Sequence, residues 1–70
     1  MSVWGARKAK IVLAALLRIG WRIKRQNGSH KVLERGGWPD YVFAFLDSEE
    51  NGPRMLPRIA RQTGLSPEDL

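Results

Sequence analysis

The sequence predicts an α+β fold in the order helix, strand, strand, strand, helix, with a three-stranded antiparallel sheet and both helices on one of its faces. Three observations predict it. Apolar side chains recur at helical spacing in residues 6–19, an alternating pattern surrounds a turn signal in residues 21–35, and helical spacing returns in residues 54–63. The 70 residues are expected to form a single domain, residues 1–70, whose core comes from the 43% hydrophobic content because the chain has no cysteine.

The first helix is expected over residues 6–19. Its apolar side chains lie three and four positions apart and form one stripe: Val12, Leu13, Leu16 and Leu17. Gly20 is expected to end the helix, because glycine adopts the left-handed conformation that closes a helix most readily. Residues 1–5 are expected to be a flexible end, with Trp4 against the body of the domain.

A β-hairpin is predicted from an alternating pattern and a turn signal. Residues 21–26 alternate apolar and polar side chains, as a half-buried strand does. Asn27-Gly28 is the strongest short hairpin signal, because a type I′ turn needs positive φ at both central positions. Residues 29–35 are expected to return as the second strand.

A two-residue loop at this turn signal determines the pairing of the two strands. It pairs Arg25 with His30, which places His30 at the edge of the apolar face. It also places Lys24 opposite Lys31 on the outer face, where like charges cost stability unless an anion binds between them. A slip of one residue would exchange the two faces, because side chains alternate along a strand.

The next part of the chain is expected to complete the sheet. Residues 36–40 read as a loop in which Trp38 covers the core, and the alternative is an exposed Trp38 that offers a stacking surface. Residues 41–46 are rich in aromatic residues and are expected to be the third strand. Residues 47–52 read as a solvated acidic loop.

The second helix is expected over residues 54–63 and before Gly64. Its regular part is expected to begin near Pro57, because proline is tolerated in the first turn and not further inside. Residues 66–70 are expected to be a short C-terminal stub with a serine cap and a proline after it. The predicted order αβββα is that of double-stranded-RNA-binding domains.

Positive charge is concentrated in the first half of the chain. Residues 1–35 carry nine Lys/Arg and one acid, whereas residues 36–70 carry three arginines and six acids. This polarity indicates a polyanionic partner, with nucleic acid first and an anionic membrane or an acidic protein next. A basic surface without such a partner is the alternative. No apolar run reaches the ~20 residues of a membrane span, so a cytoplasmic protein is expected.

Two segments resemble the HicA (YcfA-like) toxin family. Residues 20–30 read Gly-Trp-Arg-Ile-Lys-Arg-Gln-Asn-Gly-Ser-His, and the family pattern is a helix ending in glycine and an aromatic, then a strand, then Arg-Gln-x-Gly-Ser-His. Residues 55–66, with Gln-Thr-Gly-Leu-Ser at their end, resemble the closing helix of the same family. The resemblance extends over residues 12–66.

The resemblance implies a small toxin with a double-stranded-RNA-binding-like fold, which cleaves mRNA without a metal or other cofactor and is neutralised by a HicB-type antitoxin. The histidine of the Gly-Ser-His motif is catalytic in this family, which implies that role for His30. Residues 46–50 depart from the family, because they are acidic and lack the proline and the basic or histidine residue of many members. This departure implies weaker RNA approach and a reduced, altered or absent nuclease activity.

The residue types around His30 suit RNA cleavage by attack of a 2′-hydroxyl on the neighbouring phosphorus. Histidine serves as base and acid because it titrates near neutrality. The neighbours expected to bind RNA and to hold its phosphate are Arg22, Lys24, Arg25, Gly28, Ser29 and Lys31. With one histidine and no evident second proton-transfer group, the expected ribonuclease is slow.

The sequence leaves three alternatives open. A lone histidine beside a turn is more often structural than catalytic. A non-catalytic RNA-binding module of the same fold would bind phosphates and 2′-hydroxyls with the same basic surface. A DNA-binding helix-turn-helix over residues 59–66 is disfavoured, because residues 67–70 are too short and too acidic for a recognition helix.

Overall fold

The computed structural model describes residues 4–46 and 48–70. The first three residues of the predicted flexible end and Asp47 of the predicted acidic loop lie outside this description. The elements along the chain are β1 (Arg7–Lys8), α1 (Ala9–Arg18), β2 (Arg22–Asn27), β3 (His30–Arg35), β4 (Trp38–Ala44), β5 (Glu50–Asn51), α2 (Met55–Thr63) and a 3-10 turn (Pro67–Asp69).

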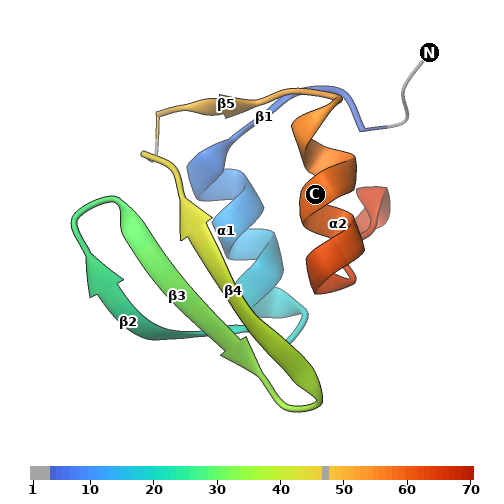
Figure 1. The fold of residues 1–70 in the computed structure, drawn as a ribbon. Coiled ribbons are helices and arrows are strands. Elements are labelled where there is room, and N and C mark those ends of the chain that lie inside the picture. Colours follow the sequence, from blue (N-terminus) through green and yellow to red (C-terminus); the bar gives the residue numbers. More distant parts are fainter. Residues whose placement is uncertain (1–3, 47) are drawn as a thin grey trace.

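Strands β2, β3 and β4 form an antiparallel sheet in that order, which confirms the predicted αβββα arrangement (Figure 1). One face of this sheet carries Leu33 and Phe43, which are buried in the core together with residues of α1 and α2. We call this the inner face and the opposite one the outer face. Both helices therefore cover the inner face, and the outer face is left to solvent.

The end of α1 follows the sequence prediction. Gly20 has φ of +114°, its amide donates to the Leu17 carbonyl (3.3 Å), and the Trp21 amide donates to the Leu16 carbonyl (3.1 Å). These two bonds form a Schellman motif, which satisfies carbonyls at the helix end. The chain then enters β2 with Trp21 in the core, where its indole nitrogen donates to the carbonyl of Thr63 at the end of α2 (3.0 Å).

A second, two-stranded sheet was absent from the sequence prediction. Arg7 and Lys8 of β1 pair with Asn51 and Glu50 of β5, so α1 begins at Ala9 and not at residue 6. The predicted acidic loop therefore contains a strand. This small sheet joins the segment before α1 to the segment before α2.

The predicted hairpin register was wrong by one residue at the turn. Asn27 pairs with His30, so the two-residue loop is Gly28-Ser29. Only Gly28 has positive φ (+62°), which is the pattern of a type II′ turn, with glycine at the first central position, and not of type I′. A register shift between Ile23 and Arg25 makes Lys24 the extra residue of a β-bulge.

The predicted loop at residues 36–40 is shorter than expected, because β4 already begins at Trp38. Pro39 is accepted in this strand because β4 is at the edge of the sheet and its register shifts between Leu33 and Arg35. Trp38 is 37% exposed and packs edge-on against Trp21, with ring centroids 6.0 Å apart. Trp38 thus covers the core, as expected, with part of its ring in solvent.

Helix α2 contains Pro57 at its third residue, where the missing amide costs no hydrogen bond within the helix. Gly64 ends it with φ of +76°, as predicted. Ser66 then caps the 3-10 turn by exchanging hydrogen bonds with Asp69, and no recognition helix follows α2 among the described residues. None of the described helices is both long enough and apolar enough to cross a membrane.

Candidate functional site

His30 is the first residue of β3 and follows the Gly28-Ser29 turn directly. Its cross-strand partners are Asn27 on β2 and Ala44 on β4, and its side chain is exposed. Because Leu33 is on the inner face and side chains alternate along β3, His30 is on the outer face. The expectation that His30 lies at the edge of the packed apolar face was therefore wrong, and His30 has no packing role in the core.

The cations of β2 share this outer face with His30. Arg22 pairs with Glu34, which shares the outer face with His30 by alternation, and Arg25 pairs with Val32. Lys24 and Arg25 stand together opposite Val32 because of the bulge. The bulge thus gathers two cations where a regular strand would place one.

Part of this positive charge is compensated. The Lys24 ammonium lies 2.9 Å from the Asp40 carboxylate on β4, and both side chains are 45% exposed. Such an exposed pair stabilises the fold by at most about 1 kcal/mol, so an anionic ligand competes for Lys24 at little cost. Arg25 has no salt bridge within the described part of the chain.

Lys31 does not lie opposite Lys24, contrary to the expected pairing. Its partners are Gln26 and the buried Phe43, so its half-buried side chain belongs to the inner face. The expected repulsion between these two lysines is therefore absent. The bulge at Lys24 places the two cations on different faces of the sheet.

Three of the predicted site residues line an open cavity at the end of the hairpin: Gly28, Ser29 and Lys31. The cavity has a volume of about 450 Å³, and its other lining residues are Gln26, Phe45, Leu46 and Ser48. Phe45 packs edge-on against Phe43, with centroids 5.0 Å apart, and so gives the cavity a firm apolar wall. The half-buried Lys31 and the polar lining residues form the rest of the cavity.

The structure therefore divides the predicted site into two groups that meet at the hairpin. Arg22, Lys24 and Arg25 share the outer face with His30, whereas the turn residues and Lys31 line the cavity. Sequence reasoning missed the contribution of the end of the third strand to this cavity. The aromatic and apolar pair Phe45-Leu46 was assigned to the strand, and Leu46 is in fact 56% exposed.

Among the described residues, the strand neighbours of His30 offer no second proton-transfer group. Its two cross-strand partners, Asn27 and Ala44, do not ionise, and Val32 is the next residue of β3 on the same face. Within residues 4–46 and 48–70, His30 is the only histidine, as it is in the whole sequence. The arrangement places one histidine on a sheet face that also carries Arg22, Lys24 and Arg25.

Residues 9–65 match the model of a protein family described as the HicA toxin of bacterial toxin–antitoxin systems. The match includes both helices, the three strands of the main sheet and His30. Searches of curated proteins and of solved structures found no significant match.

Proposed function

Because the chain belongs to the HicA toxin family of bacterial toxin–antitoxin systems, we propose that it cleaves mRNA with His30 as the proton-transfer residue. The observation that carries this proposal is the exposed imidazole of His30 on a sheet face that also bears Arg22, Lys24 and Arg25. Family membership also implies an antitoxin partner, and we infer that it is of the HicB type. An mRNA substrate would place the activity in the cytoplasm.

The proposed reaction uses the RNA's own hydroxyl. Neutral His30 accepts the proton of a 2′-hydroxyl, and that oxygen attacks the adjacent phosphorus. The bond from phosphorus to the 5′-oxygen breaks, which leaves a 2′,3′-cyclic phosphate on one fragment and a 5′-hydroxyl on the other. The departing 5′-oxygen takes its proton from water, because no second acid adjoins His30 among the described residues.

The cations stabilise the charge that develops on the phosphate. Arg25 is free to donate to the non-bridging oxygens, and Lys24 joins it when it leaves Asp40. A single histidine supplies about 10²–10⁴-fold of acceleration. The expected enzyme is therefore slow, and its toxicity depends on accumulated cleavage.

A non-catalytic RNA-binding module is the second candidate. It is favoured because the described strand neighbours of His30 include no second proton-transfer group, and because Asp40 partly neutralises Lys24. The same outer face would then hold RNA through phosphate and 2′-hydroxyl contacts alone.

Inducible expression in bacteria of the wild type, His30→Ala and Asn27→Ala separates the two candidates. Asn27→Ala is the matched control, since Asn27 is the exposed cross-strand neighbour of His30 and does not transfer protons at neutral pH. We expect the wild type and the control to arrest growth and to shorten transcripts, and His30→Ala to do neither while the purified variant keeps nearly the same RNA affinity.

Other outcomes reject the catalytic role. Growth arrest by both the wild type and His30→Ala without transcript shortening means that the protein acts by binding. The non-catalytic RNA-binding module is also favoured if the wild type, expressed at the same level, does not arrest growth while the purified protein still binds RNA.

A further inference from the structure

A second basic surface lies on α2, apart from the hairpin. All three Lys/Arg of residues 36–70 are arginines at the start of this helix or within it: Arg54, Arg58 and Arg61. They are four and three residues apart and share one helix face, because such residues are neighbours on a helix surface. The opposite face of α2 is buried through Leu56 and Ile59.

The charge of this arginine face is uncompensated. The arginines are exposed, α2 contains no acidic residue, and none of the three forms a salt bridge with any described residue. The six acids in this half of the sequence all lie outside the helix. Residues 36–70 therefore have a net negative charge, although their three arginines form a basic surface on α2.

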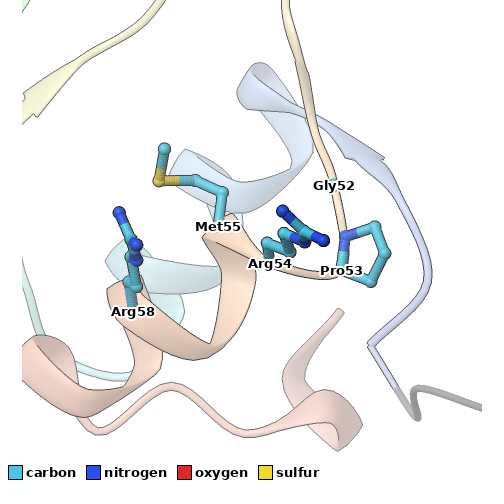
Figure 2. Close-up of a pocket in the computed structure, with 5 residues that line it drawn as sticks. All are labelled: Gly52, Pro53, Arg54, Met55 and Arg58. Carbon is cyan, nitrogen blue, oxygen red and sulfur yellow. The ribbon is translucent and has the colours of Figure 1, made fainter.

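A groove accompanies this charge at the start of α2. It has a volume of about 470 Å³ and is lined by Gly52, Pro53, Arg54, Met55 and Arg58. Figure 2 shows Met55 between the side chains of Arg54 and Arg58, with the Pro53 ring beyond Arg54. An apolar floor between two guanidinium groups suits a ligand with both an apolar group and negative charges.

The helix amides contribute little to this site. The amides of Met55 and Leu56 both donate to the Gly52 carbonyl at 3.0 Å, and Pro57 has no amide hydrogen. An anion would therefore be held by the arginine side chains, which bind carboxylates in a planar, two-pronged geometry.

The position of the groove favours a protein over RNA. Helix α2 covers the inner face of the sheet, whereas His30 is on the outer face, so one RNA segment does not reach both without passing around the domain. The apolar floor formed by Pro53 and Met55 also matches an aliphatic side chain. We propose that this groove binds an acidic segment of the antitoxin, with an apolar side chain on Met55 and carboxylates on Arg54 and Arg58.

The proposal rests on family membership for the existence of an antitoxin and is independent of the catalytic role of His30. The probes are a short synthetic peptide with glutamates on both sides of a central leucine, the same peptide with serine for leucine, and a single-stranded RNA oligonucleotide. Fluorescence anisotropy measures their binding to the wild type, to Arg54→Gln/Arg58→Gln and to Arg22→Gln/Arg25→Gln. The two double variants lose the same charge from different faces.

We expect Arg54→Gln/Arg58→Gln to weaken binding of the leucine peptide by at least about tenfold, since each arginine loses a charged hydrogen bond. Arg22→Gln/Arg25→Gln should leave peptide binding unchanged and weaken RNA binding, and the serine peptide should bind the wild type more weakly. The proposal is overturned if the wild type does not bind the leucine peptide, if both variants weaken it equally, or if Arg54→Gln/Arg58→Gln mainly weakens RNA binding. Cleavage of RNA by the Arg54→Gln/Arg58→Gln variant is measured in a separate assay, because cleavage depends on the proposed function of His30 and not on the groove.

Discussion

At the scale of single residues, Asn51 is the most unusual side chain of the core. It is 1% exposed, and neither its amide nitrogen nor its carbonyl oxygen has a hydrogen-bond partner in the described structure. A buried polar group without a partner costs about 1–3 kcal/mol. The backbone of Asn51 pairs with Arg7 in the small sheet, so β5 holds this side chain in the core although its polar atoms have no hydrogen-bond partner.

Asn51→Leu is therefore expected to raise the free energy of unfolding by about 1 kcal/mol or more, because leucine has the same branched arrangement of four side-chain heavy atoms and no polar atoms to satisfy. Urea denaturation measures the change. The control Asn27→Leu, on an exposed residue, should change stability by less than about 0.5 kcal/mol. A clear loss of stability in Asn51→Leu would mean that the amide has a stabilising partner.

The ends of α1 and α2 could be predicted from the sequence, because a helix end depends on residues that are close together in the chain. Gly20 and Gly64 each stand at the end of an apolar helical pattern, and Ser66 stands before a proline and two acids. The exposure of His30 was not readable in the same way. It depends on which alternating set of β3 side chains packs against the helices: the prediction placed Val32 on the packed face, whereas the structure buries Leu33.

At the scale of elements, two glycines with left-handed conformations have different surroundings. Gly28 in the hairpin turn has φ of +62°, and a Cβ there would meet nothing within 4 Å. Gly64 after α2 has φ of +76°, and a Cβ there would lie 2.9 Å from the ring of Trp38. The first glycine is needed for its backbone conformation alone, and the second also makes room for Trp38.

Gly28→Ala is expected to cost about 1–2 kcal/mol from backbone strain, and Gly64→Ala to cost more because Trp38 must also move. Thermal or urea unfolding measures both. In a Trp38→Ala background the clash is gone, so Gly64→Ala should cost about as much as Gly28→Ala. Equal costs in the wild-type background would show that Trp38 moves aside freely.

The elements that the sequence did not predict share a physical cause. Strands β1 and β5 have two residues each, and three of these four residues are charged, so they carry no alternating apolar pattern. The bulge at Lys24 likewise has no sequence signal, and it changes the pairing by one residue between Arg25 and Ile23. The longer strands and helices were predicted because each buries a periodic set of apolar residues.

At the scale of the whole molecule, both ends of the described chain return to the same core. Trp4 and Leu70 pack against it, and Arg18 of α1 donates a hydrogen bond to the Asp69 carbonyl. The Asp69 carboxylate accepts hydrogen bonds from the Ser66 amide (2.8 Å) and hydroxyl (3.0 Å), and these lower the pKa of Asp69 below its usual value. The closure of the C-terminal turn therefore depends on pH.

Because the pKa of Asp69 is lower in the folded state, the unfolded chain takes up its proton first as the pH falls. The stabilisation is present above the unfolded pKa of about 4 and is lost as the pH falls through the folded pKa. Asp69→Asn is expected to remove this part of the acid dependence of the urea midpoint. Glu68→Gln, in the same turn without a capping role, should retain the wild-type slope, and equal slopes in all three proteins would contradict the assignment.

The exposure of His30 also has an evolutionary consequence under the proposed function. A side chain that packs against nothing in the core is replaceable without loss of folding, so one substitution would abolish toxicity and leave the domain and its arginine groove intact. Selection on a cell that has lost its antitoxin would favour such a substitution. Lineages of this family are then expected to contain folded, harmless descendants that still capture antitoxin and thereby protect their hosts from related active toxins.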